Sequence, residues 1–179
     1  MVKLQPDFES DRYGLHVRLV REEDAEFIVR LRTDPQICRY IHSTSEDVCK
    51  QKQWIRDYIV REKQGKELYF IFSKENENIG LARLYNIEDG KFTSGSWLSC
   101  SNFIGGGVLC DIISREIAFD LFPEYINYFD IRKENRKVLR YAKSYHPVLY
   151  KEDEENFYFH TDKMTFERYK QIYLRMAKI

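Results

Sequence analysis

The chain contains few cysteines, prolines and glycines, and it has no net charge. Its 179 residues include 4 Cys, 4 Pro and 8 Gly, and 29 Lys plus Arg balance 29 Asp plus Glu. The cysteines form no Cys-x-x-Cys pair, which indicates free thiols in a reducing compartment and predicts no metal. The balanced charge argues against nucleic acid as a partner, because proteins that bind it normally carry an excess of basic residues.

Long apolar segments are also missing. The longest stretch without a charged residue, residues 92–110, is interrupted by serine and glycine and is unsuited to cross a membrane as a helix. Residues 1–10 carry acidic and polar side chains in place of the apolar segment of a signal peptide. These absences predict a soluble cytoplasmic protein with no membrane partner.

Aromatic side chains, by contrast, are abundant and make up 15% of the residues. The length predicts a single domain over residues 1–179, because it leaves no room for a second core. Hydrophobic periodicity predicts that this domain belongs to the mixed α/β class. The predicted elements are, in order, a strand over 15–20, a helix from 25 to the Asp34-Pro35 break, a helix from 45 to about 64, strands over 67–73, 78–87 and 91–100, a helix over 108–121, a strand over 128–131, a helix over 135–145, a hairpin of 147–150 and 157–160, and a last helix over 165–177.

Three consecutive glycines, Gly105–Gly107, separate a predicted strand from a predicted helix. Glycine lets backbone N–H groups approach a ligand closely, and a helix N-terminus adds unpaired N–H donors and partial positive charge, so a pyrophosphate could bind there. No Lys-Ser/Thr pair follows, which excludes a Walker A loop, and the preceding strands are joined by hairpins, which excludes a Rossmann fingerprint. An ordinary flexible turn remains the alternative.

The order of elements and the glycine loop together resemble the GNAT superfamily of N-acetyltransferases. The superfamily loop pattern Gln/Arg-x-x-Gly-x-Gly/Ala is matched by Asn102-x-x-Gly105-x-Gly107, with asparagine in place of its first residue. Residues 15–25 are similar to the strand–helix start of RimJ/RimL-type members. The resemblance implies the GNAT mixed-sheet fold over a core of about 15–160 with a C-terminal helix after it, and an acetyl-CoA-dependent N-acetyltransferase activity.

A narrower resemblance rests on Gln53-Trp54-Ile55, Gly95-Ser96-Trp97 and residues 129–139. This combination is similar to GNAT members of surface-polysaccharide clusters, which acetylate the amine of an amino-deoxy sugar carried on a nucleotide, and it implies such an acceptor for this chain. Two alternatives stay open. One is an acetyltransferase of another amine, such as a protein N-terminus or a small amine, and the other is a non-catalytic acyl-CoA-binding protein.

The resemblance also implies a site for acetyl-CoA where the strand ending at Cys100 splays from the strand over 128–131. The pantetheine arm would pair with backbone there, as an added strand does, and the pyrophosphate would bind at the glycine loop. Asn135 matches the family asparagine after the fifth strand, although it is equally suited to cap the next helix. The residues expected to bind acetyl-CoA are Leu98, Cys100, Asn102, Gly105, Gly106, Gly107, Val108 and Asn135.

Acetyl transfer needs a neutral amine and a polarised thioester carbonyl. Many GNAT members use a glutamate and a tyrosine for proton transfer, and this chain has Thr93 and Ala142 at those positions. His42, in the loop between the first two predicted helices, is the candidate base, because imidazole exchanges a proton near neutral pH. Ser96 is the candidate to protonate the leaving thiolate or to bind a sugar hydroxyl. A solvated loop histidine and a small strand residue are the respective alternatives.

Arg39 and Arg83 are candidates to bind nucleotide phosphates, because guanidinium matches phosphate oxygens bidentately. Surface ion pairs are the alternative for both arginines. Tyr85 and Trp97 complete the set of residues expected to bind the substrate. The apolar stripe of the last predicted helix could cover the sheet or a second subunit, so the sequence also allows a homodimer.

Overall fold

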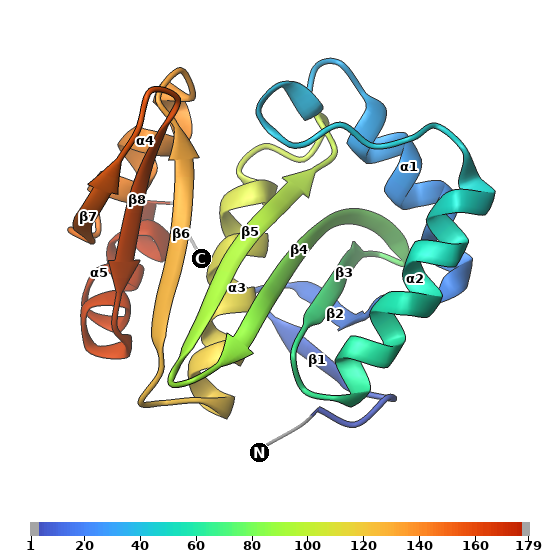
Figure 1. Cartoon of the computed structure of the whole chain (residues 1–179), viewed down its shortest axis with the longest axis horizontal. Coiled ribbons are helices and arrows are strands. Elements are labelled where there is room, and N and C mark those ends of the chain that lie inside the picture. Colours follow the sequence, from blue (N-terminus) through green and yellow to red (C-terminus); the bar gives the residue numbers. More distant parts are fainter. Residues whose placement is uncertain (1–3, 177–179) are drawn as a thin grey trace.

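The structure of the protein, a computed structural model, describes residues 4–176 (Figure 1). Its strands are β1 (Glu9–Arg12), β2 (Leu15–Leu19), β3 (Leu68–Lys74), β4 (Glu77–Glu88), β5 (Lys91–Ser99), β6 (Ile126–Arg132), β7 (Val148–Glu152) and β8 (Asn156–Thr161). Its helices are α1 (Ala25–Thr33), α2 (Val48–Lys63), α3 (Gly106–Leu121), α4 (Arg136–Lys143) and α5 (Lys163–Met176), with short 3-10 turns at Glu22–Asp24 and Cys38–Tyr40. The eight strands form one sheet in the order β1-β2-β3-β4-β5-β6-β8-β7, in which β5 and β6 run parallel.

Every predicted element is present, and the mixed α/β class is confirmed, but the prediction omitted the first strand. β1 pairs with β2 through a tight hairpin at Tyr13 and Gly14, which both have positive φ. Its sequence, Glu-Ser-Asp-Arg, contains no apolar residue. Because β1 lies at the edge of the sheet, nothing in hydrophobic periodicity could reveal it.

Several predicted boundaries are wrong by a few residues. α2 is capped by Asp47, whose side chain accepts from the N–H groups of Cys49 and Lys50, and not by Ser45. α3 begins at Gly106, two residues before the predicted start at Val108. Other bounds also shift: β6 begins at Ile126, two residues early, α4 ends at Lys143, two residues early, β7 extends through Glu152, and α5 begins at Lys163. The predicted last helical residue, Ala177, lies outside the described residues.

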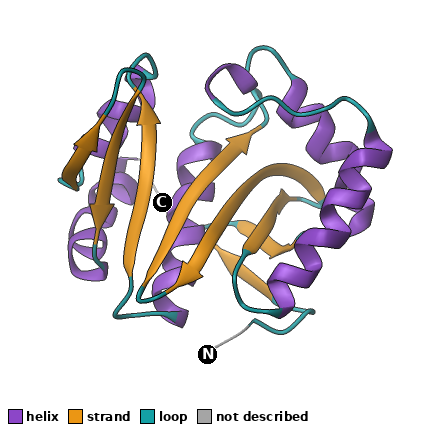
Figure 2. Ribbon diagram, in the orientation of Figure 1, coloured by secondary structure: helices purple, strands orange, loops and turns teal. Residues whose placement is uncertain are grey.

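The strands β2–β5 are buried on both faces, since α3 covers one face while α1 and α2 cover the other (Figure 2). β3 shows the consequence most clearly. Phe70 and Phe72 pack with the α3 side, and Tyr69 and Ile71 pack with the side of α1 and α2. A strand between two helical layers therefore reads as a continuous apolar run, as it does here.

A buried ion pair within α3 contacts the C-terminal part of the fold. The Arg115 guanidinium donates to Asp111 at 3.0 Å and lies over the rings of Phe129 and Tyr145, with its Cζ atom 4.5 and 5.0 Å from the two ring centroids. The Tyr141 hydroxyl of α4 donates to the second oxygen of Asp111 at 2.8 Å. The side chains of Arg115 and Asp111 are 2% and 0% exposed, so each charge depends on the other for compensation.

The apolar stripe of α5 packs against its own chain. Phe166 and Leu174 are buried in the α3 core, and Tyr169 and Tyr173 pack against the cluster of α4, β6 and β8. The homodimer allowed by the sequence stays a prediction. Within residues 4–176, no helix combines the length and the apolar character needed to cross a bilayer.

Candidate active site

The middle of β5 carries a β-bulge at Ser96. Leu98 pairs with Leu81 and Gly95 with Arg83, so β5 contains one residue more than β4 over the same stretch. Ser96 has a φ of 51°, a left-handed conformation that is uncommon for residues other than glycine. A bulge releases backbone groups from the ladder and redirects the side chains that follow it. The bulge therefore leaves backbone groups available for a ligand in the middle of the sheet.

Before this bulge, after Thr93, β5 and β6 diverge, as the family resemblance implies (Figure 1). Their parallel pairing covers only Lys91–Thr93 of β5 and Ile126–Tyr128 of β6. β6 continues to pair with β8 as far as Arg132, and β5 continues along β4. The two facing edges are therefore free of ladder partners within the described strands. A ligand with amide groups can add hydrogen bonds to such an edge, as an extended peptide does.

The glycine loop lies at the end of this divergence and opens α3. Gly105 is the N-cap residue, with a φ of 79°. A Cβ atom at Gly106 would lie 1.9 Å from the ring of Phe103, and one at Gly107 would lie 3.0 Å from the indole of Trp97. The carbonyl of Gly105 accepts from the N–H groups of Val108 and Leu109, at 3.1 and 3.2 Å. The loop therefore requires glycine for close packing, and it presents the first N–H groups of a 16-residue helix.

This cradle fits a pyrophosphate. Side chains are absent at the three positions where α3 begins, and the helix N-terminus supplies N–H donors and partial positive charge. The loop pattern begins at Asn102, which is exposed beside the cradle, and Ile104 is also exposed. The predicted phosphate-binding role of the loop is thus compatible with its geometry, and the individual contacts stay predictions.

Trp97 and Asn135 frame the inner side of the divergence. The Trp97 ring packs edge-on against Tyr141 of α4, with 6.0 Å between ring centroids. Trp97 therefore lies on the side of α3 and α4 and not beside Tyr85, with which it was grouped as a substrate contact. The Asn135 side chain accepts from Val138 N–H at 3.3 Å, which confirms that it caps α4. A contact between Asn135 and a cofactor stays a prediction.

The opposite face of the sheet carries a polar cluster near the bulge. Tyr85 of β4 lies across Gly95, where a Cβ atom would be 3.3 Å from the tyrosine hydroxyl. Burial raises the pKa of Tyr85, and the Asp130 carboxylate of β6 acts in the same direction. Desolvation also raises the pKa of Asp130, although the nearby His42 imidazole opposes that shift. His42 is exposed, and its backbone carbonyl accepts from Arg32 at 3.3 Å. The polar cluster thus combines Tyr85 of β4, Asp130 of β6 and the exposed His42 of the loop after α1.

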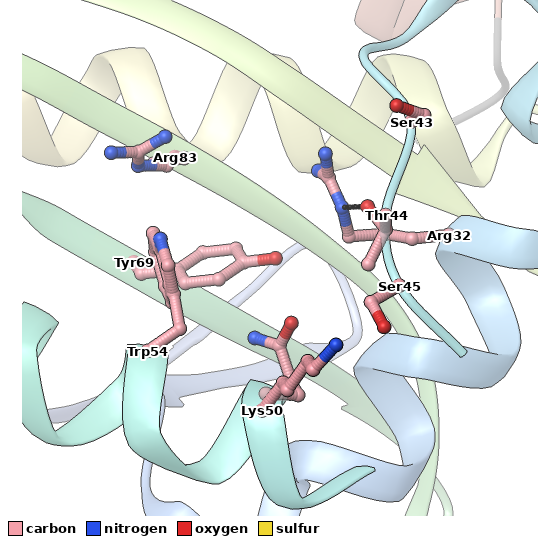
Figure 3. Close-up of a pocket in the computed structure, with 9 residues that line it drawn as sticks. Arg32, Ser43, Thr44, Ser45, Lys50, Trp54, Tyr69 and Arg83 are labelled. Carbon is pink, nitrogen blue, oxygen red and sulfur yellow. Dashed lines mark hydrogen bonds between the residues drawn. The ribbon is translucent and has the colours of Figure 1, made fainter. Parts of the chain in front are cut away.

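A cavity of about 270 Å³ lies next to this cluster, between α1, α2 and the surface of β3 and β4 (Figure 3). Figure 3 shows Arg32 of α1 and Arg83 of β4 on its upper side and Trp54 of α2 below. The residues that line it are Arg32, Ser43, Thr44, Ser45, Lys50, Gln51, Trp54, Tyr69 and Arg83. None of these is acidic, so the lining is positively charged.

The two arginines proposed from the sequence lie in different surroundings. Arg83 lines the cavity and donates to Glu67 at 2.5 Å, with its guanidinium over the rings of Trp54 and Tyr85. Arg39 lies over the ring of Tyr40 in the loop after α1 and does not line the cavity. Of the two, Arg83 is therefore the one that the fold brings to a pocket.

Comparison with known proteins identifies the fold. Residues 15–145 match the family model described as the acetyltransferase (GNAT) domain. The chain belongs to this GNAT family. It is an acetyl-CoA-dependent N-acetyltransferase that acts on an amine. No curated protein sequence matches the chain.

Solved GNAT structures are similar over most of the chain. The apo form of FdhC, described as a nucleotide-linked sugar GNAT, is 30% identical, with a TM-score of 0.82, and the match covers 94% of this chain and 98% of FdhC. The ribosomal-protein-S5-alanine acetyltransferase of Vibrio fischeri is 16% identical, with a TM-score of 0.74, and the match covers 87% and 97% of the two chains. The spermidine N-acetyltransferase of Vibrio cholerae, in complex with CoA and spermine, is also 16% identical, with a TM-score of 0.72 and coverage of 87% and 99%. These last two share the GNAT fold alone.

Three residues near the site were missed from the sequence: Arg32, Lys50 and Asp130. Arg32 and Lys50 belong to different helices, and only the packing of α1 beside α2 brings both to the cavity. Asp130 is an acidic residue in a short strand, and its position is significant only because β6 leaves β5. No local pattern in the sequence points to any of the three.

Replacement of Gly105 by alanine should weaken acetyl-CoA binding by roughly tenfold, the effect of losing one charge-assisted hydrogen bond. The added methyl group would enter the open space beside the helix N-terminus, where a phosphate must lie to reach its N–H groups. Gly90→Ala is a matched control, because Gly90 has a similar φ of 75° and also open space around its Cβ position. Isothermal titration should give the wild-type affinity for Gly90→Ala. Equal affinities of the two variants would show that the loop does not bind the cofactor.

Proposed function

We propose that this GNAT enzyme transfers an acetyl group from acetyl-CoA to the amine of an amino-deoxy sugar carried on a nucleotide. The observation that carries the proposal is the likeness to FdhC, at 30% identity over 94% of this chain. The chain resembles the polyamine and ribosomal-protein enzymes less in sequence, at 16% identity. The cationic lining of the cavity beside the bulge supports an anionic acceptor, such as a sugar nucleotide, over a cationic polyamine.

Acetyl-CoA supplies the activated acetyl thioester. The free edge of β5 near Leu98–Cys100 would hold the pantetheine arm, and the loop from Asn102 to Val108 would hold the pyrophosphate. A backbone N–H at the Ser96 bulge is suited to polarise the thioester carbonyl as a fixed dipole. In this proposal, the Ser96 hydroxyl donates a proton to the departing thiolate or binds a sugar hydroxyl.

The acceptor amine must lose a proton before or during attack on the thioester. Threonine and alanine, at the two positions where many family members carry the proton-transfer residues, supply neither a carboxylate nor a phenol for this proton. Thr93 pairs with Tyr85 in the sheet, and Ala142 is buried in the α4 cluster. The neighbouring Tyr141 hydroxyl is already committed to Asp111. His42 is the remaining candidate base, because it is exposed with Asp130 nearby.

Thiol release from acetyl-CoA in the presence of candidate acceptors tests the proposal. We expect turnover with amino-deoxy sugars linked to uridine or thymidine diphosphate, and a kcat/KM for them at least tenfold above those for spermidine and for a peptide with N-terminal alanine. A protein that binds acetyl-CoA but acetylates spermidine or the peptide more efficiently than any sugar nucleotide would refute the proposed acceptor.

A further inference from the structure

We propose that the cavity between α1, α2 and the β3–β4 surface binds the phosphates of the acceptor's nucleotide, with Arg32 and Lys50 as their main ligands. This inference rests on the proposed function and assigns to it a specific subsite. It differs from the sequence-based expectation, in which Arg39 and Arg83 contact the phosphates.

The charge of the lining is the first support. Arg32 and Lys50 both line the cavity, and among the described residues no carboxylate lies within ion-pair distance of either one. Arg83 shares one carboxylate, that of Glu67, with Arg61, at 2.5 and 2.6 Å. The positive charge of the cavity thus exceeds what nearby carboxylates neutralise, which favours a multiply charged anion as the occupant.

Arg32 is already held in place for such a ligand. Its Nε donates to the Thr44 hydroxyl at 2.7 Å (Figure 3). Its Nη2 donates to the His42 carbonyl at 3.3 Å. Both acceptors are neutral, so the guanidinium retains its full charge and further N–H donors for a ligand. A side chain fixed before binding loses less conformational entropy when the ligand arrives. Lys50 is exposed at the rim of the cavity, where its flexible ammonium group can follow a phosphate.

The size and walls of the cavity restrict which part of the ligand it holds. Its volume of about 270 Å³ falls below the roughly 300–1,000 Å³ of pockets that enclose a whole small molecule. Trp54 is stacked on Tyr58 and carries the guanidinium groups of Arg61 and Arg83 over its ring. These contacts leave little of the Trp54 ring free for a nucleobase to stack on. Phosphates fit the cavity, while the base must lie outside it.

The sheet register connects the cavity to the reacting end of the site. Tyr69 of β3 pairs with Arg83 of β4, and Arg83 pairs with Gly95 of β5, beside the Ser96 bulge. Neighbouring strands are roughly 4.8 Å apart, so the Tyr69 wall of the cavity lies two strand spacings, or about 10 Å, from β5, and the Arg83 wall lies one spacing from it. The Tyr85 side chain lies over Gly95, with its hydroxyl 3.3 Å from where a Cβ atom would be. A ligand anchored by its phosphates that extends its sugar across β4 to β5 would therefore contact Tyr85.

The test compares Arg32→Gln and Lys50→Gln with Lys52→Gln, a control that removes the same charge from α2 outside the cavity. Each enzyme is assayed with an amino-sugar nucleotide and with the same amino sugar lacking the nucleotide. We expect kcat/KM for the nucleotide to fall about tenfold or more in the two cavity variants, the effect of one lost charge-assisted hydrogen bond. In Lys50→Gln, which keeps the contact of Arg32 with the His42 backbone, activity with the free amino sugar should stay within twofold of wild type, and the KM for acetyl-CoA should do so in both variants.

Direct titration with uridine diphosphate and thymidine diphosphate separates this inference from the proposed function. Binding that weakens about tenfold in the Lys50→Gln variant, and not in Lys52→Gln, supports the subsite even if no sugar nucleotide is acetylated. An equal loss with the free amino sugar would overturn the inference, and so would a raised KM for acetyl-CoA, since the phosphates would then be those of CoA. Unchanged diphosphate binding in both cavity variants would also overturn it. Lys50 is exposed, so its variant tests the subsite without a risk to folding.

Discussion

Replacement of Asp111 by alanine should lower the free energy of unfolding by about 3–5 kcal/mol, the usual cost of removing one partner from a buried ion pair. Arg115 would remain as a cation that is 2% exposed, with only the rings of Phe129 and Tyr145 beside it. The Tyr141 hydroxyl would also lose its acceptor. Burial disfavours the charge on Arg115, but the attraction of Asp111 outweighs this and raises the pKa of the guanidinium. Without Asp111 this attraction is lost, but a guanidinium keeps its proton in proteins, so Arg115 would stay charged and uncompensated.

Urea denaturation of Asp111→Ala and Asp120→Ala measures this effect. Asp120 also lies on α3 and pairs with Arg12 at 3.0 Å, but its side chain is 56% exposed, so its loss should cost less than about 1 kcal/mol. The double replacement Asp111→Leu with Arg115→Met should recover much of the lost stability, because it removes both buried charges. Similar losses for Asp111→Ala and Asp120→Ala would show that the buried pair is not a principal contributor to stability.

Replacement of His42 by alanine should lower kcat about 10²-fold with an amino-sugar nucleotide, the lower end of the range for loss of a general base. The imidazole belongs to the loop that also lines the cavity, and it lies near enough to Asp130 of β6 to affect the pKa of that carboxylate. The defect should shrink as pH rises, because an amine that is already neutral needs no base. The KM for acetyl-CoA should stay near the wild-type value, because the glycine loop is untouched.

His16→Ala provides the control for this measurement. His16 is also a surface histidine, but it lies on β2 and interacts with Asp11 at 2.9 Å, away from the cavity and the divergence. Its loss should leave kcat unchanged over the whole pH range. A His42→Ala variant with the wild-type kcat at neutral pH would indicate that the amine loses its proton to solvent.

The strong local patterns of the sequence predicted most of the fold. In α4, the apolar residues expected to share one side, including Val138, Leu139 and Ala142, do pack together against β6 and β8. The glycine loop was recognisable because its residues are consecutive and lie between a strand and a helix. The bulge at Ser96 was not, since its positive φ depends on how β5 pairs with β4 and not on the serine itself.

The candidate site was less predictable because its residues come from distant parts of the chain. The sequence drew attention to Arg83, which the fold places in the cavity, and to Arg39, which it does not. Arg32 and Lys50 gave no local signal, because cations are ordinary on the exposed side of a helix. The loop over Ser43–Ser45 brings both helices together, and no spacing rule predicts where such a loop passes.

The short parallel ladder between β5 and β6 also bears on how the enzyme moves. Only residues 91–93 of β5 meet β6, and beyond them the sheet is divided into two leaves with separate apolar clusters. Such leaves can fluctuate about their common end, because few hydrogen bonds resist their separation. A cofactor hydrogen-bonded to both free edges would hold the two leaves together. Each release of CoA would remove these hydrogen bonds. The amide hydrogens of residues 94–99 and 129–132 should therefore exchange with solvent faster between turnovers.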